Sequence, residues 1–396
     1  MSKFPIIPRT VWVLGFVSLF MDMSSELVHS LLPVFLVSTL GTSVLTVGII
    51  EGTSEATALI AKVFSGALSD YFRRRKVLIL LGYGMAALTK PLFPLATSAE
   101  AVFIARFLDR IGKGIRGAPR DALVADVAPP EIRGACFGLR QSMDTIGAVL
   151  GPLLAILLML CLANNIKQVL WFAVLPAFLT IVLIAVGIQE PETPSASRRF
   201  RPPIRLDALR QFSGEYWSVV VIGGVFTLAR FSEAFLVLRA QQVGFAIAWV
   251  PLVMVVMSLT YAFSAYPAGI LSDRMNRRSL LATGLLSLVL ADLVLAWAAS
   301  PFVALLGVAL WGLHLGCTQG ILAAMIADVT PPELKGTAFG LFNLVSGLLM
   351  LLSSVIAGGL WVRYGAAATF HAGAVFSLVA LLVLILSVPR LSPPRR

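Results

Sequence analysis

The chain has 396 residues, of which 58% are hydrophobic and 13% are charged, and its formal net charge is +11. Soluble domains have roughly 45–50% apolar and about 25% charged residues, so a water-soluble globular protein and a disordered chain are both excluded. The basic excess does not indicate nucleic-acid binding, because the lysines and arginines cluster in short gaps between long apolar runs. The composition therefore predicts a polytopic membrane protein.

A membrane-spanning helix needs about 20 mainly apolar residues, and suitable runs fall into two sets of six. The first set is predicted at 11–37, 44–69, 77–97, 101–125, 134–162 and 167–188. The second set is predicted at 216–240, 247–271, 279–299, 301–326, 336–361 and 367–388. Only helices satisfy the backbone in lipid at these lengths. The sequence thus predicts an all-α polytopic membrane protein with twelve transmembrane helices in two pseudo-symmetric six-helix bundles.

The polar stretch between the two sets is rich in proline and arginine, as expected of a linker. We therefore divide the chain into an N-terminal bundle (1–189), a central loop (190–215) and a C-terminal bundle (216–396). Basic residues gather after the second and eighth spans, in the central loop and in the tail, whereas the opposite gaps are nearly free of charge. The positive-inside rule then places both termini in the cytoplasm, and we expect a bacterial inner (plasma) membrane protein.

The two halves repeat each other. At an offset of 203 residues, the segment that starts at Gly66 aligns with the segment that starts at Gly269. At an offset of 202 residues, 125–139 aligns with 327–341, and ten of these fifteen positions are identical. Two blocks at nearly the same offset predict parallel repeats, related by a pseudo-two-fold axis along the membrane normal.

The loops after the second and eighth spans both read Gly-x-x-x-Asp-x-x-x-Arg-Arg. With twelve spans and the repeat, this pattern resembles the major facilitator superfamily over essentially the whole chain. In that family the Asp and the Arg cluster lock the cytoplasmic side closed. The resemblance implies gating roles for the matching residues, which are Gly66, Asp70, Arg74, Arg75, Gly269, Asp273, Arg277 and Arg278. Tyr71 stands where the family often has Arg.

Two further motifs carry the same resemblance. The fourth span reads Arg110-Ile-Gly-Lys113-Gly114, where the family pattern is Arg-x-x-Gln-Gly, so Lys113 replaces Gln. The fifth span holds Gly147, Gly151 and Pro152, which match a Gly-x-x-x-Gly-Pro motif that is common in antiporter branches. This motif favours efflux by exchange. From the residues alone, small side chains allow close helix approach, and Gly151-Pro152 predicts a bend or hinge.

Ionisable side chains are costly inside a membrane and normally face a cavity or a partner. In this chain they fall in stripes at helical spacing on the first, second, fourth, fifth and seventh spans. We predict that substrate binding and proton coupling use Asp22, Glu26, Glu51, Glu55, Asp109, Arg110, Lys113, Arg140, Asp144, Arg230 and Glu233. The N-terminal half carries most of this charge, so coupling is expected there.

Each of these residues has a competing interpretation, in which buried acids and bases merely pair and fix helix register. Asp126 and Asp328 are either gate partners of the loop arginines or plain solvated loop charges. Lys90, before Pro91, is expected to extend to the outer interface. His29 is interpreted as a hydrogen-bonded neighbour, although Asp22, Glu26 and His29 are also a possible divalent metal site.

The leading hypothesis is a secondary active transporter that works by alternating access, with proton-coupled export of a small solute. The alternatives are a proton-coupled uptake symporter and a divalent metal exporter. A non-transporting receptor or scaffold is a different class, and an intramembrane enzyme built on Ser25 and His29 is another. We expect no enzymatic activity, no cofactor, no resident metal and no nucleic-acid partner. The expected partners are a small-molecule substrate, protons and the lipid bilayer, and we expect a monomer.

Overall fold

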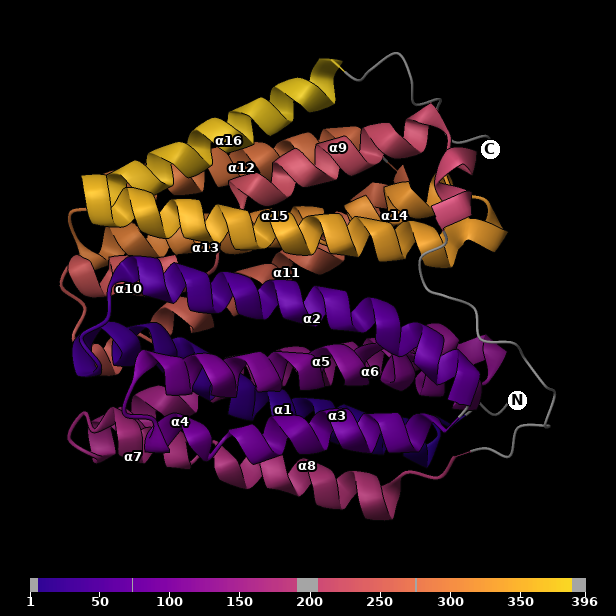
Figure 1. Ribbon diagram of the computed structural model, residues 1–396, viewed down its shortest axis with the longest axis horizontal. Coiled ribbons are helices and arrows are strands. Elements are labelled where there is room, and N and C mark those ends of the chain that lie inside the picture. Colours follow the sequence, from indigo (N-terminus) through magenta and orange to yellow (C-terminus); the bar gives the residue numbers. More distant parts are fainter. Residues whose placement is uncertain (1–5, 73, 191–205, 275, 387–396) are drawn as a thin grey trace. The chain divides into compact units, whose positions relative to one another are not determined.

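The computed structural model describes residues 6–72, 74–190, 206–274 and 276–386 (Figure 1). Within these residues the fold is helical throughout, with no strand. Eleven helical segments are long and apolar enough to cross a membrane. The helix α5 (Ala99–Val127) is also 29 residues long, but it holds nine charged residues and fails the same criterion. With α5 included, the predicted twelve spans are present.

Several of the twelve spans are interrupted within the membrane-crossing segment. The third span ends as α3 (Arg75–Thr89) and resumes as the short α4 (Leu92–Leu95) around Pro91, because proline cannot donate a backbone hydrogen bond. The sixth span is divided into α7 (Ile166–Trp171) and α8 (Val174–Gly187). The first span, α1 (Arg9–Val34), continues into a π-helical turn at Phe35–Thr39.

The chain forms two compact units, which do not follow chain order completely. Unit 1 comprises Met1–Phe35 and Thr57–Pro203, and unit 2 comprises Leu36–Ala56 and Ile204–Arg396. The helix α2 (Val44–Phe72) therefore contributes its first half to unit 2 and its second half to unit 1.

In unit 1, α1 packs against α6 (Arg133–Cys161) and α8, and α3 packs against α5 and α8 (Figure 1). Apolar side chains of α1, α3 and α8 form its core, including Val17, Tyr83 and Ile184. A charged helix such as α5 is unfavourable in lipid, so it is stable here only because its polar side chains point into the unit. Ser98 caps its start by accepting a hydrogen bond from the backbone N–H of Ala101.

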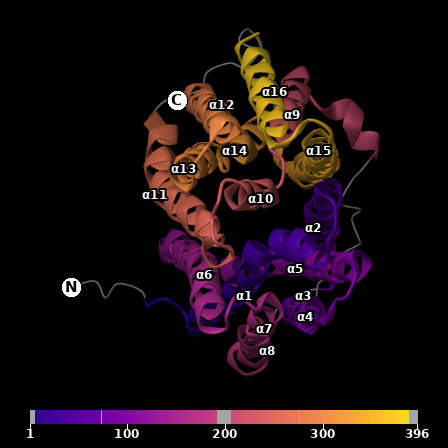
Figure 2. The same ribbon diagram turned by 90° about the vertical axis from the view of Figure 1, so that its left-hand side faces the viewer.

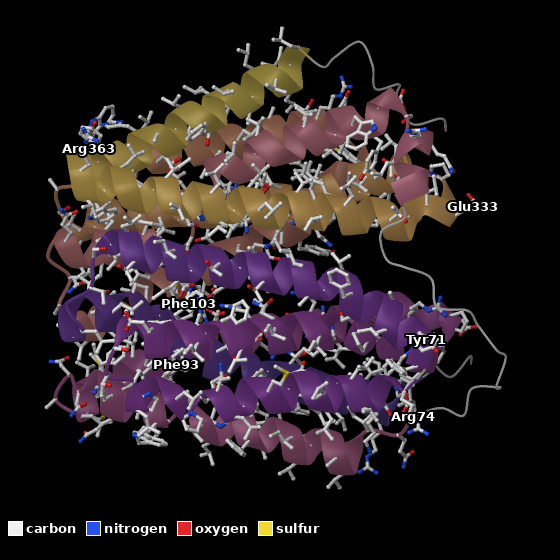
Figure 3. All side chains as sticks on the ribbon, in the orientation of Figure 1. Tyr71, Arg74, Phe93, Phe103, Glu333 and Arg363 are labelled. Carbon is white, nitrogen blue, oxygen red and sulfur yellow. The ribbon has the colours of Figure 1, made fainter. Side chains whose placement is uncertain are left out.

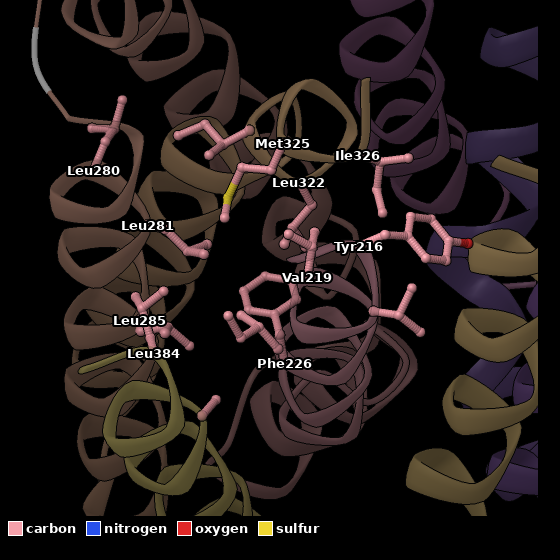
Figure 4. Close-up of a cluster of buried hydrophobic side chains, with 14 of the residues drawn as sticks. Tyr216, Val219, Phe226, Leu280, Leu281, Leu285, Leu322, Met325, Ile326 and Leu384 are labelled. Carbon is pink, nitrogen blue, oxygen red and sulfur yellow. The ribbon is translucent and has the colours of Figure 1, made fainter. Parts of the chain in front are cut away.

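Unit 2 contains eight α-helices besides the first half of α2. These are α9 (Gly214–Ala229), α10 (Ala234–Gln242), α11 (Leu252–Arg274), α12 (Arg277–Trp297), α13 (Pro301–Thr318), α14 (Ile321–Asp328), α15 (Lys335–Tyr364) and α16 (Ala366–Leu386). The helix α12 packs against α13 and α16, and α9 packs against α15 and α16 (Figure 2). Side chains of α9, α12, α14 and α16 meet in an apolar cluster that includes Phe226, Leu285 and Met325 (Figure 4).

The sequence repeat is visible in local structure. Short 3-10 turns occur at Pro130–Ile132 and Pro332–Leu334, and each leads directly into a long helix, α6 or α15. These two helices begin at Arg133 and Lys335, which are 202 residues apart. The identical Pro-Pro-Glu segments therefore build the same turn in both units.

Candidate functional site

Charged side chains gather inside unit 1, on α1, α5 and α6. Arg106, Asp109 and Arg110 are all at most 2% exposed, and Arg116 and Arg140 are also buried. Helical spacing of three or four residues places the charges of α5 on one side of the helix, as the sequence predicted. This concentration of buried charge is the candidate site.

One cluster of the site surrounds Asp109, which is 2% exposed. The Nζ of Lys90 lies 2.9 Å from Asp109 Oδ1 and also donates to Ser25 Oγ at 3.0 Å. Arg106 Nη1 approaches Asp109 Oδ2 at 4.0 Å. The expectation that Lys90 extends to the interface was wrong, because its side chain is only 1% exposed and is neutralised in place by Asp109. We call Lys90, Asp109, Arg106 and Ser25 the lysine cluster.

A second cluster joins α5 to α6. Arg120 Nε lies 3.2 Å from Asp121 Oδ1, and Arg120 Nη1 lies 3.7 Å from Asp144 Oδ1. Arg140 Nε lies 3.7 Å from Asp121 Oδ1, and Arg140 Nη1 lies 3.6 Å from Asp144 Oδ2. The network contains two cations and two carboxylates, so it is balanced in charge. Arg120 also donates to Ser18 Oγ on α1 at 3.1 Å. We call Arg120, Arg140, Asp121 and Asp144 the arginine network.

The helix α1 places its two acids against these groups. The carboxyl group of Asp22 interacts with that of Asp144, and Lys113 and Arg116 are further electrostatic neighbours. Glu26 Oε2 lies 3.3 Å from His29 Nδ1, and Lys113 and Arg110 act on it as well. Lys113 is therefore an electrostatic neighbour of both α1 acids. Two carboxyl groups that face each other cannot both ionise cheaply, so this pair is suited to hold a proton.

Two glycines of α6 set the distance to α1. A Cβ added to Gly147 would collide with the carbonyl oxygen of Leu19, and one added to Gly151 would lie 2.5 Å from that of Met23. Pro152 follows inside the helix. The Gly-x-x-x-Gly spacing therefore produces close backbone contact between α1 and α6, which carry Asp22 and Asp144.

The second span is one continuous helix, α2, so its charged residues keep the helical spacing of the sequence. Glu51 is fully buried and Glu55 is half-buried, and both belong to the part of α2 that is grouped with unit 2. Lys62 belongs to unit 1. A role of Glu51 and Glu55 in binding or coupling stays a prediction.

The seventh span is broken at the predicted pair Arg230 and Glu233. The helix α9 ends at Ala229, and α10 begins at Ala234 after an irregular segment. We expected the two residues to share one face of a continuous helix, but the break separates them. Ser354 of α15 accepts a hydrogen bond from the backbone N–H of Ser232 at 3.3 Å, which satisfies a group that the break would otherwise leave unpaired.

Two ion pairs among the predicted gating residues are described, and they lie in different units. Arg75 Nη1 lies 2.7 Å from Asp126 Oδ2, and Arg277 pairs with Asp328. Both pairs are partly exposed, and Arg74 is exposed at the same end of unit 1 as Tyr71 (Figure 3). Gly66 and Gly269 lie in α2 and α11, and the backbone N–H of Arg278 donates to Asn276 Oδ1. The side chains of Asp70 and Asp273 lie outside the described residues.

Several contacts near the predicted site residues were not predicted from the sequence. Glu190 accepts hydrogen bonds from the backbone N–H groups of Arg75 and Lys76, and Lys76 Nζ donates to the carbonyl of Ile188 at 2.8 Å. Arg116 lies over the ring of Tyr83 at 4.5 Å. Glu190 is 115 residues from Arg75 in the chain, so no local pattern could have connected them.

In the described part of the chain, no three His, Cys, Asp or Glu side chains come together as a metal site. The possible site at Asp22, Glu26 and His29 is therefore reduced to the contact between Glu26 and His29. Twelve helical spans in two units, one of which encloses a network of buried charges, define a polytopic membrane protein with a polar interior.

Comparison with known proteins is consistent with this architecture. The profile described as Major Facilitator Superfamily matches residues 14–252 and 231–396. An MFS-type transporter of Methanocaldococcus jannaschii is 33% identical over 383 residues, which cover 95% of this chain and 94% of that protein. Major facilitator superfamily domain-containing protein 10 of Homo sapiens is 26% identical, over 83% of this chain and 76% of its own length.

Solved structures share the fold. The nucleoside transporter NupG superimposes with a TM-score of 0.81 at 12% identity, covering 96% of this chain and 100% of that one. The human organic anion transporter MFSD10 superimposes with a TM-score of 0.66 at 22% identity, again covering 96% and 100%. The chain belongs to the major facilitator superfamily. It is accordingly an integral membrane transporter of the secondary type.

Proposed function

We propose that this transporter exports a small organic anion in exchange for protons, by alternating access. The single observation that carries the proposal is the position of Asp144 on α6 between Arg120 and Arg140, with the Asp22 carboxyl of α1 as its electrostatic neighbour. A carboxyl pair beside mobile cations can take up a proton when the cations move away and release it when they return. Substrate and proton would then compete for the same arginines.

The choice of an anion follows from the charge balance of the site. Leaving aside the first and last turns of the helices, the cations on α1, α5 and α6 are Arg106, Arg110, Lys113, Arg116, Arg120 and Arg140, and Lys90 is counted with them. The acids are Asp22, Glu26, Asp109, Asp121 and Asp144. Cations are in excess, and Arg110 and Lys113 are the ones that act on Glu26. The description of the structurally similar human protein as an organic anion transporter supports the same class.

Export is favoured over uptake by the Gly-x-x-x-Gly-Pro motif, which holds α6 against α1 through Gly147 and Gly151. Export and uptake differ in the sign of the proton movement, so both are testable in one assay. Metal export is a weaker alternative, because the described residues offer no three-ligand cluster. We further propose that Arg75–Asp126 and Arg277–Asp328 act as gates, since the same pair recurs at the same offset of 202 residues.

The test is solute-linked proton movement in proteoliposomes. The purified chain is reconstituted with an internal pH-sensitive dye, and organic anions, organic cations and a transition metal are added in turn. We expect proton movement opposite to the anion, its loss in Asp22→Asn and Asp144→Asn, and its retention in Glu100→Gln. Glu100 is the matched control because it is an acid of α5 that lies exposed in the first turn of the helix, outside both clusters.

Three results would contradict parts of the proposal. Proton movement in the same direction as the solute would make the protein an uptake symporter. Anion transport without any proton movement would make it a uniporter and reduce Asp22 and Asp144 to structural partners. Transport of cations but not anions would overturn the substrate class.

A further inference from the structure

Unit 2 contains one acid whose surroundings differ from those of every acid in the lysine cluster and the arginine network. Asp292 lies on α12 and is fully buried. Neither of its carboxyl oxygens has a hydrogen-bond partner among the residues that the structure describes, and no ion pair reaches it there. By contrast, Asp109 and Asp144 in unit 1 are each approached by two cations.

The neighbours of Asp292 are aromatic and small. A Cβ added to Gly373 on α16 would lie 2.5 Å from Asp292 Oδ2 and 3.0 Å from Phe231 Cε1. Phe231 in turn contacts the rings of Trp311 and Phe370, with centroids 5.3 and 5.6 Å apart. The carboxyl group is thus enclosed by α12, α16 and an aromatic cluster, in space that is available because residue 373 has no side chain.

The charged and titratable groups of the surrounding helices are engaged elsewhere. His314 Nδ1 on α13 donates to the carbonyl of Gly284 at 2.9 Å, and His371 on α16 packs on Trp297. Arg239 on α10 donates to three backbone carbonyls at the end of α12, and Asp328 on α14 pairs with Arg277. Arg230 is an electrostatic neighbour of His314. In the described region none of these groups forms a hydrogen bond or ion pair with Asp292.

We propose that Asp292 is a proton-binding site in unit 2 and that it carries its proton in this conformation. An ionised carboxylate without a partner is far more costly in an apolar interior than a neutral carboxylic acid, so the proton is the ligand that makes this site stable. A metal ion needs several further ligands, and the described residues supply no cluster of three. The site is independent of the carboxyl pair in unit 1.

Asp292 lies close to the break in the seventh span, so its protonation state affects that segment. Phe231, its aromatic neighbour, lies in the break between α9 and α10, next to Arg230. Loss of the proton would place a negative charge beside this break. The proton on Asp292 is therefore expected to stabilise the present arrangement of the interrupted seventh span.

The test is infrared spectroscopy of the full-length protein in lipid nanodiscs, without any solute. At neutral and mildly alkaline pH we expect a carboxylic-acid C=O band that shifts in heavy water, is lost in Asp292→Asn and persists in Asp144→Asn. The matched control is Asp126→Asn, which removes an ion-paired, partly exposed acid and should leave the band unchanged. A carboxylic-acid spectrum that is the same in Asp292→Asn as in the parent protein would overturn the proposal. Any component that belongs to the Asp22–Asp144 pair is removed by Asp144→Asn instead.

A second variant covers the case in which Asp292→Asn does not fold. Gly373→Ala adds a methyl group next to the carboxyl oxygen and should shift the frequency of the same band without removing it. An unshifted band would show that the protonated group is elsewhere. The measurement needs no transport, so its outcome is separate from that of the proteoliposome assay.

Discussion

Lys90 and Asp109 form an ion pair inside unit 1, with Nζ 2.9 Å from Oδ1 and both side chains at most 3% exposed. Removal of one partner of a buried pair typically costs about 3–5 kcal/mol, because the other charge stays buried. Asp109→Asn removes a carboxylate that both Lys90 and Arg106 approach, whereas Lys90→Met leaves Asp109 with Arg106 at 4.0 Å. We therefore expect Asp109→Asn to destabilise the protein more than Lys90→Met.

The measurement is the free energy of unfolding of both single variants and the double variant in detergent. The double variant should lose less than the sum of the single losses, since it removes both charges of the pair. Lys335→Met, at an exposed lysine, is the control and should change stability by no more than about 0.5 kcal/mol. Equal and small effects for both single variants would show that the pair contributes little.

Gly147 and Gly151 are predicted to tolerate no side chain. Gly147→Ala and Gly151→Ala would each force α6 away from α1, and overpacking of this kind typically costs about 1–3 kcal/mol. Transport should fall with stability, because Asp22 and Asp144 would separate. Gly138→Ala on the same helix is the matched control, since an added Cβ there meets nothing within 4 Å. If all three variants behave alike in thermal unfolding and transport assays, close packing is not the reason for the motif.

The paired gates are predicted to affect transport more than stability. Arg75→Asp and Asp126→Arg each place like charges together, and each should slow transport, whereas the double reversal should restore it. A partly exposed pair contributes only about 0.2–1 kcal/mol to stability, so the melting temperature should hardly move. The same reversal at Arg277 and Asp328 should give the same result. Arg133→Ala, at an exposed arginine, serves as control, and a double reversal without rescue would argue against a gate.

The break in the seventh span is predicted to depend on Ser354. Ser354→Ala removes the acceptor for the backbone N–H of Ser232, and a lost hydrogen bond to a buried group costs about 1–3 kcal/mol. Ser218→Ala is the control, because its hydroxyl bonds only within the exposed start of α9. Hydrogen exchange of the backbone amide of Ser232 should increase in Ser354→Ala alone. Unchanged exchange would mean that the break is held by other contacts.

The boundaries of the spans were predictable because they depend on local composition. The proline at Pro91 explains the end of α3 without reference to any other helix, and the stripes on α1, α5 and α6 follow from helical spacing. The seventh span is different. Its break at Arg230 has no proline or glycine between Arg230 and Glu233. The hydrogen bond at the break comes from Ser354, which is 122 residues from Ser232.

In the candidate site, too, some features follow from local sequence and others depend on residues far apart in the chain. Helical spacing predicted that Asp109, Arg110 and Lys113 share a face, and the structure confirms that Asp109 and Arg110 are buried. Spacing along one helix could not show that Lys90 is the main partner of Asp109, because the two residues belong to different helices. It also could not distinguish Asp292, which has no described partner, from an acid with one.

The sequence by itself determined the family, the twelve spans, the repeat and the concentration of charge in the N-terminal half. These properties depend on apolar length, periodicity and motif spacing, all of which can be measured along the chain. Only the tertiary structure decided which acid meets which base, where Lys90 points and which buried carboxyl has no partner among the described residues. Those outcomes depend on side chains from different helices, whose ionisation and pairing are set by burial and distance in three dimensions.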